Sequence, residues 1–396
     1  MLKWIQFLFM LLYMSSYQPD LIPLSLYIHM PWCVRKCPYC DFNSHELQGG
    51  QLDLALEQQY LKALIEDLKS QLDFVQGREI RSVFIGGGTP SLISGQGYQW
   101  LFTEIQKLVT FKSDAEVTME ANPGTLEHAP FEEYLLAGIN RLSLGVQSFN
   151  NEHLKNLGRI HDADNACNAI VNARKAGFER LNVDLMHGLP QQTLEQALFD
   201  LQQAIRLGAT HISWYQLTVE LNTVFYRNQP TLPDEDVLEQ IQLQGEALLK
   251  ANGFSNYEVS AWTKELPSQH NLNYWQFGDY LAIGAGAHGK VSLNDGVYRF
   301  QKTRLPKDYL DKVPADHLQF KRIVDEEMPF EFMMNALRLT EGVPAHYYNE
   351  RTPLQLADIE SIEALKQKKL LKDDKNMLAC TEQGRMYLNT LLENFL

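Results

Sequence analysis

The 396-residue sequence has few cysteines, an excess of acidic over basic residues, and no long hydrophobic run. Three of its five cysteines lie within eight positions, which is not the pattern of a secreted disulfide framework, so we expect a reducing compartment. Lysine and arginine number 35 against 49 aspartates and glutamates. The net charge of −14 argues against DNA or RNA as the main partner, because nucleic-acid affinity depends on clustered positive charge.

An apolar run over residues 4–13 follows a lone Lys3 and resembles the start of a signal peptide. It is too short to span a bilayer, and no clear small-residue cleavage site follows it. We expect residues 1–23 to be an extension outside the fold, with Met14 as an alternative start. The cytoplasm is the expected location, and peripheral membrane contact through this extension is the second interpretation.

From Leu24 onward, short β-rich segments alternate with longer amphipathic segments, which is typical of βα units around a parallel sheet. Strands are expected at residues 24–29, 82–85, 116–120, 141–145, 181–185 and 211–217, and helices at 54–74, 98–110, 163–176, 194–207 and 234–251. Six units are too few to close an eight-stranded barrel. The sequence therefore predicts an α/β fold with an open, partial (β/α)6 barrel over residues 24–262.

The remaining sequence predicts two further parts. Residues 263–315 are expected to form a loop-rich bridge, and Val259 to contribute an edge strand before it. Residues 316–396 are expected to form a small C-terminal helical, winged-helix-like domain, with a helix at 359–369 and a strand at 377–380. No internal repeat or low-complexity tract is present.

Cys33, Cys37 and Cys40 form a CxxxCxxC motif just after the first predicted strand. Three thiolates on one loop can ligate three irons of a 4Fe-4S cluster and leave the fourth iron open. The alternative is a structural zinc site, but zinc needs four closed ligands. His29 and His45 are the nearby nitrogen donors, and neither completes a pair at standard spacing.

Glycines and polar residues stand where other predicted strands end. The carboxyl ends of parallel strands form one edge, and βα proteins place their chemistry there. Gly87 and Gly88 follow the second strand, where glycine lets backbone approach a ligand closely. Glu120, Gln147 and Asp184 end three further strands. Each is equally explained alone as a turn, helix cap or solvated residue, and only their combination indicates a site.

In combination these motifs resemble the radical S-adenosylmethionine (SAM) superfamily. Within it, they resemble the family of the oxygen-independent coproporphyrinogen III dehydrogenase and its paralogues, the HemW-type haem chaperones. The likeness extends from Leu24 to the last residue and includes the motifs at 120–123, 145–149 and 187–190. It implies a 4Fe-4S cluster on the three cysteines and SAM chelated to the open iron. The residues that it assigns to SAM are Tyr27, Tyr39, Gly87, Gly88, Thr89, Glu120, Gln147, Arg159 and Asp184.

Two motifs distinguish the branches of this family. The dehydrogenase branch has a further cysteine two positions after the last cluster ligand, where this sequence has Phe42. Residues 270–275 match the HNxxYW motif of the chaperone branch, in which the histidine is implicated in haem binding. Imidazole is a common haem ligand, although His270 is also explained as a core or capping residue. The other candidate histidines are His187, His211 and His288.

The resemblance therefore implies a haem chaperone that delivers haem to haem-dependent proteins such as respiratory enzymes. Oxidative decarboxylation of coproporphyrinogen III is the alternative, and an RNA-modifying radical enzyme is a third interpretation that the charge opposes. No catalytic residue is assigned. A homodimer is compatible with the sequence but is not indicated by any motif.

Overall fold

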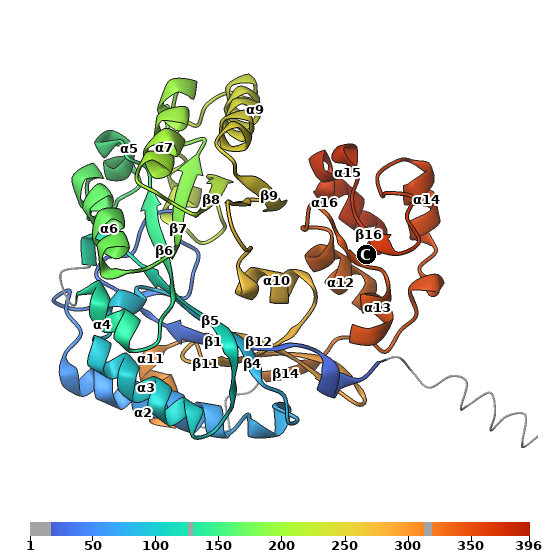
Figure 1. Cartoon of the computed structure of the whole chain (residues 1–396), viewed down its shortest axis with the longest axis horizontal. Coiled ribbons are helices and arrows are strands. Elements are labelled where there is room, and N and C mark those ends of the chain that lie inside the picture. The colour runs from blue at the N-terminus through green and yellow to red at the C-terminus, as the bar shows by residue number, and fades with distance from the viewer. Residues whose placement is uncertain (1–16, 126–129, 313–318) are drawn as a thin grey trace, which may run out of the picture.

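The computed structural model describes residues 17–125, 130–312 and 319–396 (Figure 1). The expected extension therefore lies outside the described residues as far as residue 16. From Tyr17 the prediction is wrong, because this part of the chain is packed: Tyr17 and Ile22 are buried in the C-terminal core. The Tyr17 hydroxyl also donates to the carbonyl oxygen of Leu293 at 2.9 Å. None of the described helices is long and apolar enough to cross a membrane.

Six parallel strands form the centre of a twelve-stranded sheet and are hydrogen-bonded in chain order. They are β1 (Leu24–Met30), β4 (Ile80–Gly87), β5 (Phe111–Ala121), β6 (Arg141–Gln147), β7 (Arg180–His187) and β8 (His211–Gln216). The helices on the outer face of this sheet are α2 (Leu54–Lys69), α3 (Gly95–Gln106), α4 (Phe131–Leu136), α5 (Asn151–Asn156), α6 (Ala163–Ala176), α7 (Leu194–Arg206) and α9 (Glu235–Ala251) (Figure 1). The predicted α/β fold with six βα units is confirmed.

Local sequence explains where these helices begin and end. Asp162 caps α6 by accepting from the backbone N–H of Asn165, whose side chain in turn accepts from the backbone N–H of Asp162. Gly177 ends the same helix in the left-handed conformation at φ 103°. Strands such as β4 are buried on both faces, because helices cover one side and the interior of the curved sheet the other.

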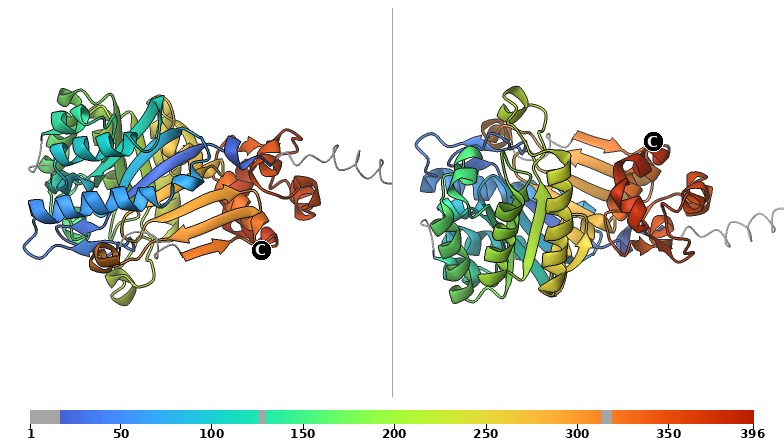
Figure 2. Two further views of the ribbon diagram at one scale, coloured as in Figure 1. Left: turned by 90° about the horizontal axis from the view of Figure 1, so that it is seen from below. Right: turned by 90° about the horizontal axis from the view of Figure 1, so that it is seen from above.

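The prediction of a loop-rich bridge over residues 263–315 is wrong. This region contains α10 (Gln269–Trp275), β11 (Asp279–Ile283), β12 (His288–Leu293), β13 (Gly296–Gln301) and α11 (Pro306–Lys312). β11 pairs in parallel with β1, and β12, β13 and β14 (Gln319–Arg322) continue the sheet antiparallel (Figure 2). Buried Asp279 joins these strands, since it binds Lys290 and Arg78, both at 2.8 Å.

The opposite edge of the sheet carries β10 (Ala261–Thr263) and β9 (Ser255–Glu258), both antiparallel to their neighbours. Val259 lies in the turn between these two strands, so edge strands are present on both sides of it but Val259 itself belongs to neither. The side chain of Trp214 on β8 packs under Gly245 of α9, where an added Cβ would come within 2.0 Å of the indole. A glycine is therefore required at this crossing.

The C-terminal part has five short helices and its own core. They are α12 (Met328–Ala336), α13 (His346–Arg351), α14 (Ser361–Gln367), α15 (Glu382–Met386) and α16 (Leu388–Leu392), with β15 (Val343–Pro344) paired antiparallel to β16 (Met377–Leu378). Phe277 packs on Phe332 with ring centroids 5.2 Å apart and so connects this core to the segment after α10. The views in Figure 2 show these helices beside the antiparallel strands of the large sheet.

Candidate functional site

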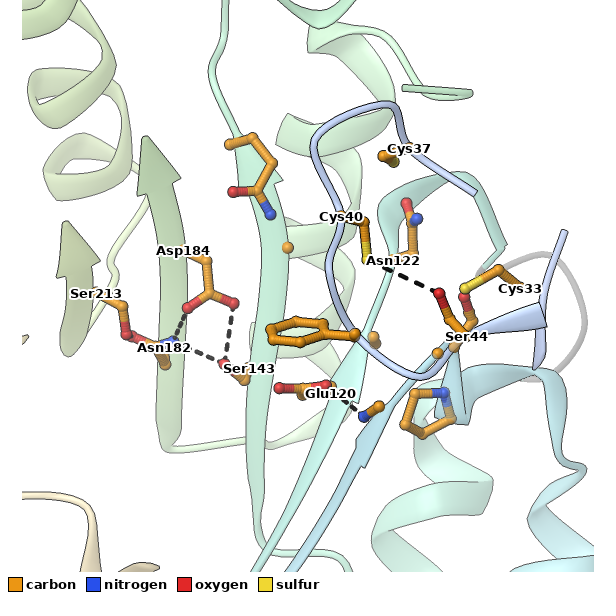
Figure 3. Close-up of a pocket in the computed structure, with 18 of the residues that line it drawn as sticks. Cys33, Cys37, Cys40, Ser44, Glu120, Asn122, Ser143, Asn182, Asp184 and Ser213 are labelled. Atoms are coloured by element: carbon orange, nitrogen blue, oxygen red, sulfur yellow. Dashed lines mark hydrogen bonds between the residues drawn. The ribbon is translucent and has the colours of Figure 1, made fainter. Parts of the chain in front are cut away.

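A cavity of about 360 Å³ opens at the carboxyl ends of the parallel strands. Cys33, Cys37 and Cys40 line one side of it, on the loop that leaves β1 (Figure 3). Cys33 lies in β2 (Trp32–Cys33), which pairs in parallel with β3 (His45–Glu46) and so closes the loop on itself. All three cysteines are free thiols and half-buried. The motif thus forms a closed loop at the edge that the sequence predicts for chemistry.

Polar side chains surround the thiols. Ser44 Oγ lies 3.8 Å from Cys40 Sγ, and Arg159 Nη1 donates to Cys37 Sγ at 3.5 Å. Burial raises the pKa of the Cys33 and Cys40 thiols, and hydrogen bonds from Ser44 act in the opposite direction. Groups that stabilise negative charge on sulfur are therefore already in place around the loop.

This donor set fits a cubane cluster better than a zinc ion. Across the part of the chain that the structure describes, no three His, Cys, Asp or Glu side chains lie close enough to hold one metal ion. The three thiols of a 4Fe-4S site each bind a different iron and are spread over several ångströms. Three thiols on one loop beside an open cavity are compatible with this mode of binding.

Two carboxylates face the thiols across the cavity (Figure 3). Glu120 accepts a hydrogen bond from the backbone N–H of Gly87 at 3.1 Å, while Asp184 accepts from Asn182 at 2.7 Å and from Ser143 at 3.1 Å. Burial, with the nearby charge of Asp184, raises the pKa of Glu120 to about 8. Burial also raises the pKa of Asp184. Such buried carboxyls are well placed to bind the hydroxyl or ammonium groups of a ligand.

Gln147 and Arg159 complete the predicted rim. Gln147 has φ 70°, a left-handed conformation that is uncommon for a non-glycine residue, and its side-chain oxygen accepts from the hydroxyl of Tyr215 at 3.0 Å. Arg159 donates to the carbonyl oxygen of Gly145 at 2.6 Å and to the hydroxyl of Tyr39 at 3.4 Å. Arg159 thus connects the end of β6 with the cysteine loop.

The glycines after β4 have a more specific role than the sequence indicated. Gly87 has φ 109°, and a Cβ there would lie 2.4 Å from the His29 ring. A Cβ on Gly88 would lie 2.3 Å from the carbonyl oxygen of Trp32, and the Gly88 and Thr89 amides donate to carbonyl oxygens of the β1–β2 segment. The glycines therefore permit close packing against β1 in addition to bordering the cavity.

Tyr27 and His270 are the two predicted site residues that do not line this cavity. They line a second cavity of about 510 Å³ beside it, and Phe42, Gly87 and Glu120 border both cavities. The predicted SAM residues other than Tyr27 lie with the cysteines, while His270 lies behind the shared wall. The structure thus places most of the predicted SAM residues and the predicted haem residue in two different cavities, whereas the sequence could assign them only by motif.

His270 differs from His29, the other buried histidine that lines this cavity. Its ring stacks on Phe84 with centroids 4.0 Å apart and meets the edge of Tyr274 at 4.3 Å. Neither ring nitrogen makes a hydrogen bond to the described residues, whereas both nitrogens of His29 are engaged, by Tyr27 and by the carbonyl oxygen of Asn43. Burial, and then the charge of Arg141, lowers the pKa of His270 to about 3, so the ring is neutral.

The three alternative histidines differ in their hydrogen bonds and in their positions relative to the two cavities. His211 uses both ring nitrogens, on Asn182 at 2.6 Å and on Tyr257 at 2.9 Å. His187 packs on Trp214 with centroids 4.4 Å apart and lines neither of the two cavities. His288 lies exposed on the rim of the second cavity. His270 and His288 are therefore the candidates that face this cavity with ring nitrogens free of hydrogen bonds to the described residues.

The sequence reasoning missed several polar residues of the first cavity. They are Asn122, Arg141, Ser143, Asn182, Ser213 and Tyr215. A signal was present, because polar residues recur every second position near the ends of strands that are otherwise apolar, as in Asn182 and Asp184 or Ser213 and Tyr215. Alternate residues of a strand face one side of the sheet, so such pairs mark the interior of an open barrel.

Comparison with known proteins agrees with this geometry. The family model of the radical SAM superfamily matches residues 27–203, and that of the HemN C-terminal domain matches residues 324–387. The solved structure of coproporphyrinogen III oxidase (HemN) from Escherichia coli superposes with a TM-score of 0.78 at 21% identity, covering 96% of this chain and 92% of that one. Fold and matches together define a radical SAM architecture with a HemN-type C-terminal domain.

Curated relatives specify the family further. The chain is 48% identical to "Heme chaperone HemW" of Haemophilus influenzae over 386 residues, covering 96% of this chain and 99% of the relative. It is also 48% identical to the protein of that name from Escherichia coli over 379 residues, covering 94% and 98%, and 32% identical to that of Bacillus subtilis, covering 94% and 99%. The chain belongs to the HemW family of haem chaperones.

Proposed function

We propose that this protein binds haem and delivers it to haem-dependent proteins, respiratory enzymes among them, and that it carries a 4Fe-4S cluster and SAM. The observation that carries the proposal is the second cavity: it is lined by aromatic residues and contains His270, a neutral imidazole with no hydrogen-bond partner among the described residues. Neutral imidazole is the form that ligates haem iron. The curated names of the family members support the same assignment.

The first cavity is the proposed place of the cluster and SAM. Cys33, Cys37 and Cys40 would hold three irons, and the open fourth iron, when SAM is bound there, supplies the reductive chemistry of the superfamily. Glu120 and Asp184 would accept hydrogen bonds from the amino and hydroxyl groups of SAM. The other residues proposed to contact SAM are Tyr27, Tyr39, Gly87, Gly88, Thr89, Gln147 and Arg159.

Phe42 argues against the dehydrogenase alternative. Its side chain is 59% exposed and borders both cavities, at the position where the dehydrogenase branch has a cysteine. A phenyl ring can neither donate a proton nor form a radical intermediate as a thiol can. The likeness to HemN, at 21% identity, concerns the fold and carries no assignment of that activity.

Two assays on one anaerobically reconstituted preparation test the proposal. The first is a spectral titration with haem, followed by transfer to an apo-form haem protein. The second supplies coproporphyrinogen III, SAM and reductant. We expect saturable haem binding with transfer, and no porphyrinogen product above the level without protein. Sustained decarboxylation would overturn the chaperone assignment, as would the absence of haem binding.

Several expectations from the sequence stay predictions. They are the cytoplasmic location, peripheral membrane contact through the N-terminal residues, and a homodimer. No catalytic residue is proposed, because no described side chain can be given a chemical step independently of the cluster and SAM.

A further inference from the structure

The second cavity has a buried floor and an exposed rim. His270 lies at the floor and is 6% exposed, with half-buried Glu120 beside the wall shared with the first cavity. Phe42, His288 and Arg304 line the exposed rim. A ligand entering this cavity would therefore place one edge among buried groups and the opposite edge in contact with solvent.

Aromatic rings form the walls between floor and rim. Tyr274 and Tyr280 meet at 4.4 Å between ring centroids in an edge-on arrangement, and Tyr27 lines the same cavity. Flat rings of this kind suit a large planar apolar ligand, whose faces they can contact with little loss of side-chain entropy. The volume of about 510 Å³ admits such a ligand with part of its edge at the rim.

Arg304 is an available cation on this rim. Its backbone carbonyl oxygen, rather than its guanidinium, holds the cysteine loop, accepting from Asn43 at 2.9 Å and from His45 at 3.3 Å. The guanidinium donates through Nε to Asn43 at 3.4 Å, and its two terminal nitrogens make no hydrogen bond or ion pair with the described residues. Arg299, in contrast, is engaged by Glu331 at 2.7 Å and by Tyr280.

We propose that Arg304, together with His288 on the same rim, binds the two propionate carboxylates of haem, so that haem enters the second cavity with its carboxylates outward. This inference rests on the proposed function and adds the site and orientation of the cargo. The opposite orientation would bury both propionates beside His270, out of water and away from the charge of Arg304, which is costly for a carboxylate. Arg–carboxylate pairing is bidentate and specific, which suits it to fixing the orientation of haem.

One carboxylate on the rim opposes the pairing. Asp41 is exposed and lines the same cavity, so it would repel a propionate that approaches Arg304. We therefore expect Asp41→Asn to tighten haem binding modestly and Arg304→Gln to weaken it. Opposite changes in haem affinity at two positions of the same rim would not follow from a general disturbance of the fold.

The test compares haem with haem whose two propionates are esterified, titrated into the full-length protein with its cluster reconstituted. Arg304→Gln should lower the affinity for haem by about tenfold and leave the affinity for the diester unchanged, because the ester has no charge for the arginine to pair with. Arg322→Gln is the matched control: Arg322 is exposed on β14, pairs with Asp325 and does not line the cavity.

The outcomes are distinct. Equal affinities of wild type and Arg304→Gln for haem would overturn the inference while leaving haem binding, and so the proposed function, intact. Weakening by Arg35→Gln without any effect of Arg304→Gln would place haem in the first cavity, which Arg35 lines, and would also overturn it. Failure of the wild type to bind haem would overturn the inference together with the proposed function.

Discussion

Arg159 Nη1 lies 3.5 Å from Cys37 Sγ, and this contact brings a buried positive charge to the loop proposed to hold the cluster. The sequence assigned Arg159 to SAM only through resemblance, whereas the structure connects it to a cysteine sulfur and to the carbonyl oxygen of Gly145. Positive charge and hydrogen bonds near the sulfurs favour the reduced, more negative cluster. Arg159 is therefore a residue that can adjust the cluster potential.

Arg159→Gln should make the reduction potential of the reconstituted cluster more negative, by on the order of 50 mV, because a charge-assisted hydrogen bond to sulfur is lost. Arg159→Lys keeps the charge and should shift the potential less. Both are measured by potentiometric titration followed by electron paramagnetic resonance, in the absence of SAM. Identical potentials for the three proteins would show that Arg159 does not act on the cluster.

Replacing Cys33, Cys37 or Cys40 by alanine should abolish the broad iron–sulfur absorbance of anaerobically reconstituted protein, because each thiol is proposed to hold one iron. Cys167 and Cys380 are matched controls, since neither lines the cavity and Cys380 is buried in the C-terminal core. Iron and sulfide content is the measurement. Zinc in place of iron and sulfide in the wild type would contradict the cluster proposal.

Asp184→Ala should weaken SAM binding by about tenfold or more in calorimetric titration, because two hydrogen-bonded carboxylate oxygens face the cavity. Asp184→Asn keeps the shape and should lose less. The same test on Gly87→Val would be ambiguous, because its side chain would meet His29 before any ligand. SAM affinity unaffected by either Asp184 variant would show that the site has been misplaced.

Acid should destabilise the fold through its buried histidines. Burial lowers the pKa of His29 and His187 to about 4, and that of His161 and His270 to about 3. In the unfolded chain these histidines have a pKa near 6.5 and bind protons below that pH. The free energy of unfolding is therefore at its full value above pH 6.5 and falls as the pH drops towards 4 or 3. At pH 5 the free energy of unfolding is lower by roughly 2 kcal/mol for each such histidine.

Thermal unfolding at pH 7 and pH 5 measures this effect, and His187→Gln should reduce the difference between the two pH values. His187 is suited to the test because it lines neither cavity and its Nδ1 has no partner among the described residues. An equal loss in wild type and variant would assign the acid sensitivity to other groups.

The sequence predicted the six parallel strands because each is a short apolar run followed by an amphipathic helix with clear end signals, such as Gly177 after α6. It could not predict that residues 279–301 extend the sheet. Buried Asp279 and Lys290 interrupt these strands, and buried Lys302 directly follows the last of them. Only tertiary pairing makes such charges compatible with a core: Lys290 meets Asp279, and Lys302 meets Asp67 from α2.

Residues of the candidate site were predictable where they belong to a short motif of fixed spacing. They were not predictable where the residues that meet in the fold are far apart in the sequence. The cysteine loop and the strand-end residues Glu120, Gln147 and Asp184 follow from local pattern, since parallel strands bring their ends to one edge. No local pattern indicates that His270 lies against Phe84 in a separate cavity, or that Arg304 reaches its rim. Those positions depend on the parallel pairing of β11 with β1.

The central claim is that haem binds at His270, apart from the cluster. The most direct measurement is a spectral titration of His270→Ala with haem, with iron and sulfide content determined on the same sample and repeated from pH 7 to pH 5. We predict a shifted Soret band, weaker binding and unchanged cluster content. In the wild type, affinity should hold over this range, because His270 has a pKa of about 3 and stays neutral. An unchanged Soret position and affinity in His270→Ala would contradict the account and direct the search to His288.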